Sequence, residues 1–336
     1  MPGNANYTTI LTTTLANYRN QLTDNIFKDR PLSNWLMSKG RTRMLSGGEK
    51  IVEQLIYAQG QAGSYADYDQ IAIAAQGGLT AAEFAWRQLY ATIAISGIEE
   101  LKNSGKEALI DLLKAKVMQA EETLKDNVNA MLFGDGTGNS NKEWFGLKSH
   151  ISGLDSGGVR VGTANLGGID GATDTFWNSI IAGDSVGTAT ALTLQTLATP
   201  YNSSSKGNDK IDAMFTTQTL FEGYEALLLP SVRRSEAKSA DAGFDNLLFK
   251  GKPLFYDADC AAGSIYGINS KYLTLVGHQD RWFKNSGFTD NAASAHATSG
   301  ATNIVDARYA IITAVGNLTV SNRKRHFRCV NFEPAV

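Results

Sequence analysis

Cysteine is scarce in this chain of 336 residues, which contains only Cys260 and Cys329. Two cysteines cannot form the framework of several disulfides that stabilises small secreted domains, and no CxxC pair is present. We therefore expect a protein that folds without structural disulfides. Histidines are also few, and their spacing does not suggest a metal site, so we expect neither a metal nor another cofactor. The four histidines are His150, His278, His296 and His326.

Long apolar runs and a strong charge excess are missing as well. No stretch approaches the roughly 20 apolar residues that span a bilayer. Residues 1–15 lack the basic start and apolar core of a secretory signal, so we expect no membrane partner. The formal net charge is −2, which gives no general reason to expect nucleic-acid binding. With 43% hydrophobic residues, the chain can fold as one large domain or as two intergrown domains.

The sequence also lacks a complete catalytic motif. Residues 45–49 (LSGGE) match the signature loop of ABC transport ATPases, but no P-loop is present to work opposite it. Residues 183–187 (GDSVG) match the nucleophile elbow of hydrolases, and Asp257 or Asp259 with His278 would complete a triad in the right order. That fold needs strands alternating with helices, which the sequence does not indicate. We therefore expect no enzyme, and keep a serine hydrolase centred on Ser185 as the alternative from a different class.

Two further groups of polar residues have structural interpretations beside functional ones. Residues 134–143 (GDGTGNSNKE) follow a predicted helix, whereas a phosphate-binding loop should precede one. They also lack the distal glutamate of an EF-hand, so we favour a turn, with a weak cation site as the alternative. A basic cluster near the C-terminus can meet phosphate or a neighbour's acids, or form a solvated strand edge, and both interpretations stay open. It consists of Arg323, Lys324, Arg325 and Arg328.

A long amphipathic helix is the clearest positive signal. Ser104 and Glu107 form a capping box, and Gly134 follows the last residue of the periodic pattern. The sequence predicts a helix over residues 105–133, about 43 Å long at 1.5 Å per residue. Its apolar stripe recurs at spacings of three and four residues and should be buried. The stripe comprises Leu109, Leu113, Val117, Ala120, Leu124, Val128 and Met131.

A two-stranded ribbon is predicted before this helix. Residues 51–57 (IVEQLIY) and 68–74 (YDQIAIA) have strand composition and are separated by a small, polar segment. A lone hairpin is marginally stable in water, so the ribbon should lie against another surface. The side chains expected to make that contact are Ile51, Leu55, Tyr57, Tyr65, Tyr68, Ile71 and Ile73.

The rest of the chain gives weaker patterns. Residues 1–48 are polar and indicate an arm that packs on something else, with a terminal segment closing its own domain as the alternative. The C-terminal run 307–332 indicates two long strands around Gly316-Asn317. Further expected elements are strands over 84–95, 210–217 and within 247–276, helices over 192–198 and 218–229, and a loop over 284–303.

The order of these elements resembles that of tailed-phage major capsid proteins with the Hong Kong 97-type fold. The resemblance rests on the polar arm, the ribbon, residues 93–138 (IAISGIEELKNSGKEALIDLLKAKVMQAEETLKDNVNAMLFGDGTG), Gly146-Leu147 and residues 251–276. It implies an α+β fold with five parts. These are an N-terminal arm (1–48), an extended β-ribbon loop (49–83), a peripheral domain with the spine helix 105–133 (84–170), an axial domain (171–303) and C-terminal strands returning to the peripheral domain (304–336).

The resemblance also implies a function without catalysis. Subunits of this family assemble into pentamers and hexamers of an icosahedral shell that encloses double-stranded DNA without sequence-specific contacts. The implied partners are other copies, a portal protein, a separate scaffolding protein and, left open, a decoration protein. The implied location is the virion, after assembly in the host cytoplasm. A shell of the encapsulin nanocompartment type is the alternative within the same fold.

The resemblance raises the question of a covalent crosslink. Some members of the family weld their shells with an isopeptide bond between a lysine of the extended loop and an asparagine of a neighbour. Here no lysine lies between Lys50 and Lys102, and Arg87, the basic residue in that interval, is a poor nucleophile. Lys50 lies at the base of the predicted ribbon. We therefore expect a shell held by noncovalent contacts.

Overall fold

The computed structural model describes residues 30–71, 77–102, 112–228, 247–287, 292–293, 304–305 and 307–334. The predicted arm up to residue 29 and the capping box at Ser104 and Glu107 lie outside these residues. The chain divides into two compact units, each built from segments far apart in the sequence. The first unit includes Gln88–Val128 and His278–Val315, and the second includes Asp29–Arg87, Asn129–Gly277 and Gly316–Val336.

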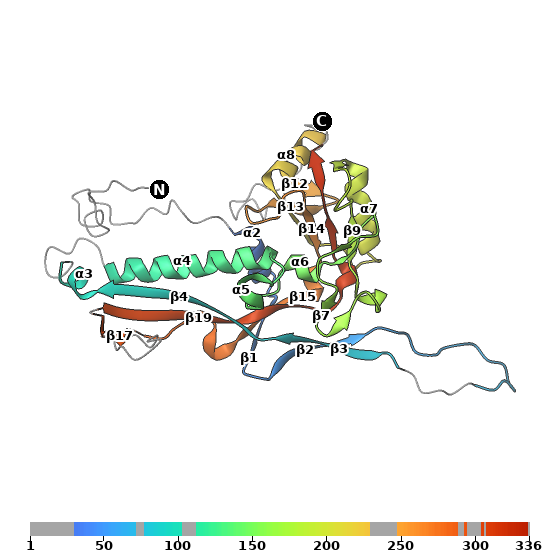
Figure 1. The fold of residues 1–336 in the computed structure, drawn as a ribbon. Coiled ribbons are helices and arrows are strands. Elements are labelled where there is room, and N and C mark those ends of the chain that lie inside the picture. The colour runs from blue at the N-terminus through green and yellow to red at the C-terminus, as the bar shows by residue number, and fades with distance from the viewer. Residues whose placement is uncertain are drawn as a thin grey trace. The chain divides into compact units, whose positions relative to one another are not determined.

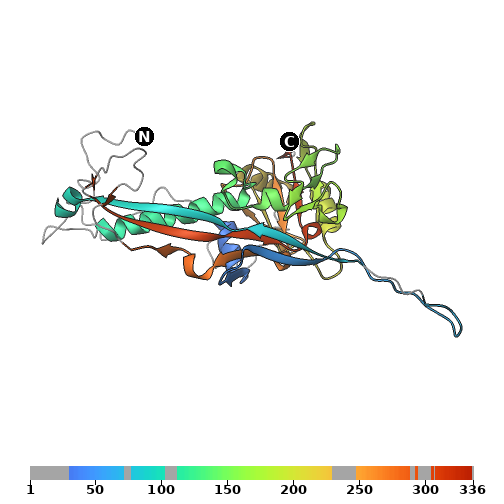
Figure 2. The ribbon, with the colours of Figure 1, turned by 60° about the horizontal axis from the view of Figure 1, so that its bottom comes forward.

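The first unit places a long helix beside long strands (Figures 1 and 2). Helix α4 (Leu112–Phe133) runs along strand β4 (Arg87–Ser96), and β4 pairs with β19 (Ala307–Val320). Strand β16 (Lys284–Asn285) also pairs with β19, in antiparallel register. α4 and β19 continue into the second unit at their C-terminal ends. The smaller elements are α3 (Gly97–Lys102), η4 (Gln279–Arg281), β17 (Ala292–Ala293) and β18 (Ile304–Val305).

The predicted long helix is confirmed over residues 112–133, and its expected first residues 105–111 lie outside the described part. The helix ends as the glycine signal predicts, because the N–H of Gly134 donates to the carbonyl oxygen of Met131 at 2.9 Å. A second glycine is required nearby, since a Cβ at Gly146 would collide with that same oxygen. The short helix α3 before α4 was not predicted.

The second unit is built on a six-stranded mixed sheet in the order β12-β13-β11-β14-β20-β9. β11 pairs with β13 and β20 pairs with β9 in parallel, whereas the other neighbours are antiparallel. The parallel pairs join segments far apart in the sequence. The strands are β9 (Ile180–Ala182), β11 (Ala213–Thr216), β12 (Leu247–Phe249), β13 (Lys252–Tyr256), β14 (Ile265–Ile268) and β20 (Phe327–Cys329).

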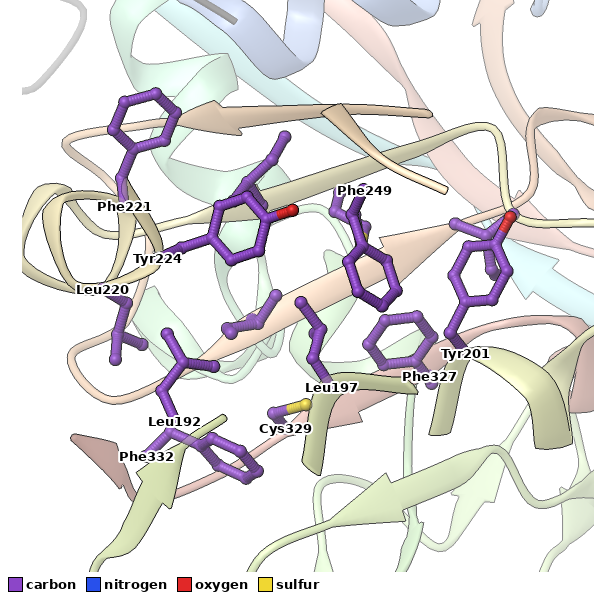
Figure 3. Close-up of a cluster of buried hydrophobic side chains, with 14 residues drawn as sticks. Leu192, Leu197, Tyr201, Leu220, Phe221, Tyr224, Phe249, Phe327, Cys329 and Phe332 are labelled. Atoms are coloured by element: carbon purple, nitrogen blue, oxygen red, sulfur yellow. The ribbon is translucent and has the colours of Figure 1, made fainter. Parts of the chain in front are cut away.

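Two helices cover this sheet and close its core (Figure 3). α7 (Leu194–Ser204) begins with a capping box between Thr193 and Thr196 and contributes Leu197 and Tyr201 to the core. α8 (Gln218–Leu227) contributes Leu220, Phe221 and Tyr224. The strands supply Phe249, Phe327, Cys329 and Phe332, among others. The helix expected over 218–229 is therefore observed nearly as predicted, and the one over 192–198 is longer than predicted.

The remaining elements of the second unit are short. They are α2 (Pro31–Ser38), β1 (Thr42–Leu45), β2 (Lys50–Ile56), β3 (Leu79–Ala85), α5 (Gly138–Asn141), α6 (Leu147–His150), β5 (Gly153–Leu154), β6 (Arg160–Val161), β7 (Asn165–Leu166), β8 (Ile169–Asp170), η2 (Thr175–Trp177), β10 (Thr190–Leu192), η3 (Ser270–Tyr272), β15 (Leu273–His278), η5 (Arg323–Arg325) and β21 (Phe332–Pro334).

The prediction of two C-terminal strands around Gly316-Asn317 is wrong. β19 runs without a turn through both residues, because they pair with Gly277 and Val276 of β15 in an antiparallel ladder. The Asn317 side chain is fully buried and bonds backbone instead of making a turn. Its amide nitrogen donates to the carbonyl of Ala85, and its oxygen accepts the N–H groups of Phe145 and Leu318. Tertiary partners thus override a local turn signal.

The ribbon is present, but its second strand was placed wrongly. β2 pairs with β3 from Lys50↔Ala85 to Ile56↔Leu79, so the partner strand is not residues 68–74. Residues 68–71 lie in the connecting segment, and residues 72–76 are outside the described part. The observed register has a physical reason, since it sets Ile51 opposite Phe84 on the buried face.

Candidate functional site

The buried stripe of α4 agrees with its periodicity where side chains are described. Ala120, Leu124 and Val128 are buried, while Val117 and Met131 are partly exposed. Leu109 lies outside the described residues, and the side chain of Leu113 does as well. Helix α4 therefore packs through one face, as an amphipathic helix should.

A buried polar network at the end of α4 was not predicted. The side-chain oxygen of Asn129 accepts the N–H of Ser33 at 3.3 Å, and its nitrogen donates to Asp257 and Asp259 at 3.2 and 2.9 Å. Asp257 also accepts the N–H of Leu32 at 3.4 Å, which satisfies a free donor at the start of α2. Burial raises the pKa of the Asp257 carboxyl. Helix α2 lies within the predicted arm (1–48), so the network ties this part of the arm to its own unit instead of leaving it free to pack on something else. No local sequence pattern signals the network.

The ribbon base, defined as β2 and β3, is packed within its own unit. Ile51 and Phe84 are fully buried, Leu55 is 6% exposed, and the ring of His150 lies 5.8 Å from that of Phe84. The expectation that Ile51 and Leu55 contact a neighbouring subunit is therefore wrong, because the chain's own side chains already cover them. Tyr57, at the end of β2, stacks on Phe176 with ring centroids 5.3 Å apart.

Charged contacts fix the ribbon base further. Lys50 and Glu83 form a cross-strand ion pair at 2.7 Å, which raises the pKa of the lysine. Glu53 accepts from Arg43 at 2.6 Å and from the hydroxyl of Thr319 at 3.2 Å. The Lys50 amine is thus held at the base of the ribbon.

The ribbon loop, defined as residues 57–71, is exposed at every residue and runs away from the rest of its unit (Figure 2). Tyr68 is 98% exposed, Tyr65 70% and Ile71 64%; Ile73 lies outside the described residues. Ile56 and Leu79, paired where the loop begins, are also exposed. Clustered exposed apolar side chains of this kind mark interaction surfaces.

The glycine-rich segment after α4 acts as a structural turn. The Asp135 carboxylate accepts from the N–H and hydroxyl of Thr137 and pairs with Lys148 at 3.0 Å, which holds its pKa well below the usual range. The guanidinium of Arg87 donates to the carbonyls of Gly136 and Glu143. These contacts use the polar groups that a cation or phosphate would need. Among the described residues, no group of three or more His, Cys, Asp or Glu could hold a metal ion.

Both interpretations of the C-terminal basic cluster, contact with phosphate or a neighbour's acids and a solvated strand edge, are wrong for Arg323 and Arg328. Arg323 is fully buried and donates to the carbonyls of His150, Ser149 and Thr163 at 2.8–3.2 Å. Arg328 is 6% exposed and lies on β20, which is paired on both sides and is not a sheet edge. Lys324 is exposed and Arg325 is partly exposed. Arg323 and Arg328 therefore lie in the interior of the second unit.

Two of the four histidines also lie in the interior of the second unit. His150 and His326 are fully buried, and burial together with Arg323 lowers the pKa of each to about 3. Both rings are therefore neutral near pH 7. His278 accepts the N–H of Asp280 on the surface, and His296 lies outside the described residues.

The GDSVG segment does not have the surroundings of a nucleophile elbow. The hydroxyl and N–H of Ser185 both donate to one carboxylate oxygen of Asp155. Strand β9 precedes the segment, but the next element is β10 and not a helix. Asp257, one of the proposed acids, is engaged by Asn129 instead. Ser185 therefore joins two loops of the second unit.

Comparison with protein-family models finds no match, and comparison with curated proteins finds none either. No helix among the residues that the structure describes has the length and hydrophobicity to cross a membrane. Solved structures, in contrast, give clear counterparts over nearly the whole chain.

The chain is similar to the protein in the cyanophage A-1(L) capsid asymmetric unit, with a TM-score of 0.72 and 18% identity over 98% of this chain and 99% of that chain. It is similar to the capsid of a native GTA particle, with a TM-score of 0.61 and 8% identity over 96% of both chains. It is also similar to the SrpI encapsulin of Synechococcus elongatus PCC 7942, with a TM-score of 0.55, 11% identity and coverage of 97% and 96%. At such low identity these likenesses show the fold: the chain has the Hong Kong 97-type α+β fold, as predicted.

Proposed function

We propose that this chain is the major capsid protein of a tailed bacteriophage, which self-assembles into an icosahedral shell around double-stranded DNA. The observation that carries the proposal is the fold shared with the cyanophage A-1(L) capsid across 98% of this chain and 99% of that one. The exposed ribbon loop supports it, because the loop presents apolar and aromatic side chains that the subunit does not cover.

In this proposal the subunit has no catalytic role. Copies meet as pentamers and hexamers, with the predicted arm and the ribbon loop reaching neighbours, and many modest contacts add up to a stable shell. A portal protein, a separate scaffolding protein and a decoration protein are the proposed further partners, and packaged DNA is enclosed without sequence-specific contacts. Assembly in the host cytoplasm and the division into peripheral and axial domains belong to the same proposal.

A second candidate is a nanocompartment shell that encloses proteins instead of a genome. The likeness to the SrpI encapsulin favours it, although the TM-score of 0.55 is lower than the 0.72 of the cyanophage capsid. Cryo-electron microscopy of the protein co-produced with its neighbouring gene products separates the two. Shells that take up double-stranded DNA through a portal vertex support the phage capsid. Closed shells with an enzyme cargo and no portal support the nanocompartment, and a protein that forms no shells contradicts both.

We also propose that the shell is held together without covalent links. The one lysine at the ribbon, Lys50, is engaged by Glu83 at the ribbon base, away from the exposed loop. Particles boiled in detergent under reducing conditions should run as one band near the chain mass of 36.2 kDa. A ladder of multimers surviving this treatment would contradict the proposal.

A further inference from the structure

Arg323 is a fully buried cation that pairs with no carboxylate among the described residues. Its Nε and Nη2 donate to uncharged acceptors, the carbonyls of His150, Ser149 and Thr163. Burial and the neighbouring guanidinium of Arg160 lower the pKa of Arg323 to about 9, so the side chain is charged at neutral pH and a second cation lies close to it. Burying a charge is costly unless an opposite charge compensates it.

Three buried polar groups around this cation have no hydrogen-bond partner within the part of the chain that the structure describes. They are the Nη1 of Arg323, the Nε2 of His326 and the hydroxyl of Ser152. The Nδ1 of His326 accepts the N–H of Asn269 at 3.2 Å, so in the neutral ring the proton is on Nε2. Both nitrogens without a partner are therefore donors, and the hydroxyl can donate as well.

The three side chains gather where β9 begins. Arg323 and His326 are joined by a 3-10 turn, which places side chains three residues apart on the same side. The carbonyl of His150 accepts from the Nε of Arg323 at 2.8 Å and from the hydroxyl of Ser179 at 3.4 Å. The N–H of Ser179 donates to the carbonyl of Ser152 at 2.8 Å, and the N–H of the first residue of β9 donates to that of His326 at 3.3 Å. Arg323, His326 and Ser152 are called the donor cluster below.

The donor cluster fits a small anion. Its charge is positive, and its two nitrogens can only donate hydrogen bonds. All three groups are buried, so the ligand has no part that reaches solvent. The carboxylate that acts on His326, that of Asp212, already accepts the N–H and hydroxyl of Ser270 at 3.0 and 2.6 Å and lies 4.0 Å from the amine of Lys252. A water molecule would also accept the hydrogen bonds, but it would leave Arg323 without a counter-charge.

We infer that Arg323, His326 and Ser152 bind one anion of the size and charge of chloride in the interior of the second unit. The anion accepts hydrogen bonds from Nη1, Nε2 and the hydroxyl, and its charge offsets that of the guanidinium. It stabilises the junction of α6, β9 and η5. The inference goes beyond the proposed function and does not rest on it, because the site lies within one folded subunit.

The first test uses bromide, which has the charge of chloride and a similar size and scatters X-rays anomalously, as water does not. Crystals of the wild-type protein grown in sodium bromide should show an anomalous peak within hydrogen-bond distance of the Nη1 of Arg323 and the Nε2 of His326. Crystals grown without bromide provide the control map. A bromide map without a peak at the donor cluster would overturn the inference.

The second test measures binding through stability. Unassembled subunits are denatured with urea while sodium gluconate replaces sodium chloride at constant ionic strength, because gluconate is too large for a buried site. Between about 20 and about 200 mM chloride, the folding equilibrium constant should rise about tenfold, the mass-action limit for one site. The same constant at both concentrations would contradict the inference.

Two serine variants show whether the dependence on chloride comes from the donor cluster. Ser152→Ala removes a donor that has no partner among the described residues, and it should weaken anion binding about tenfold and so reduce the dependence. Ser179→Ala is the matched control, since this buried serine donates to the carbonyl of His150, and its dependence should stay that of wild type. Equal dependence in the two variants would count against the site.

Removal of the charge is the strongest variant. Arg323→Met should abolish the dependence on chloride, and a wild-type dependence in this variant would overturn the inference. If Arg323→Met does not fold, as judged by circular dichroism, the bromide map and the two serine variants decide.

Discussion

The ribbon base and the ribbon loop are consecutive in sequence but differ in burial, because the base buries one of its faces whereas every loop residue is exposed. In the base, Ile51 and Phe84 are fully buried against the second unit, while in the loop Tyr68 is 98% exposed. A large apolar side chain stabilises the fold of a subunit only if folding of that subunit removes the side chain from water. The comparison teaches that the base contributes to the stability of one subunit, and the exposure of the loop supports the proposal that the loop serves association between subunits.

The largest effect should come from a cavity in the ribbon base. Phe84→Ala should lower the free energy of unfolding by about 3–5 kcal/mol, because it removes a fully buried ring. Tyr68→Ala in the loop should change it by less than about 0.5 kcal/mol. Urea denaturation of unassembled subunits measures both. Equal losses of unfolding free energy in the two variants would contradict the conclusion that the base, and not the loop, stabilises the subunit.

A second substitution that creates a cavity tests the packing of α4. Leu124 is 1% exposed, so Leu124→Ala should lower the free energy of unfolding by about 2–5 kcal/mol and reduce the yield of particles. Met118 is half exposed on the same helix, and Met118→Ala is the control with little expected loss. Wild-type thermal stability of Leu124→Ala would show that the apolar stripe is not what anchors the helix.

Lowering the pH should reduce the stability of the ribbon base and should have no such effect through the ribbon loop. His150 contacts Phe84, and its pKa is lowered from 6.5 to about 3 by burial, so the unfolded chain binds more protons than the folded one between these values. Stability from this group is full above pH 6.5 and falls as the pH drops toward 3. The loop contains no histidine. Subunits with His150→Gln, compared with wild type by urea denaturation at pH 7 and pH 4.5, should lose less stability on acidification; an unchanged pH dependence would contradict this assignment.

The smallest effect is expected at Ser185. Its hydroxyl bonds Asp155 in a surface loop, so Ser185→Ala should leave particle assembly as in wild type. A generic ester assay checks the alternative. Turnover by the wild-type protein that this substitution abolishes would favour the hydrolase.

The sequence patterns predicted correctly those features that depend on interactions between residues close together in the chain. The spacing of Leu124 and Val128 and the position of Gly134 depend on one helix, so α4 could be predicted to its last residue. The pairing of β2 with β3 could not, because the register depends on which residues face the core of the second unit. The burial of Arg323 depends on carbonyls 160–174 residues earlier in the chain, and no short pattern carries that information.

The most direct measurement is sedimentation velocity of wild-type protein beside a variant lacking residues 59–67, with circular dichroism of the unassembled subunits as a check on folding. All nine deleted residues are exposed loop residues. We expect wild type to sediment as large shells and the variant as small species with a wild-type spectrum. A variant that unfolds, or one that assembles into the same shells as wild type, would contradict the claim that the loop serves association and not the fold.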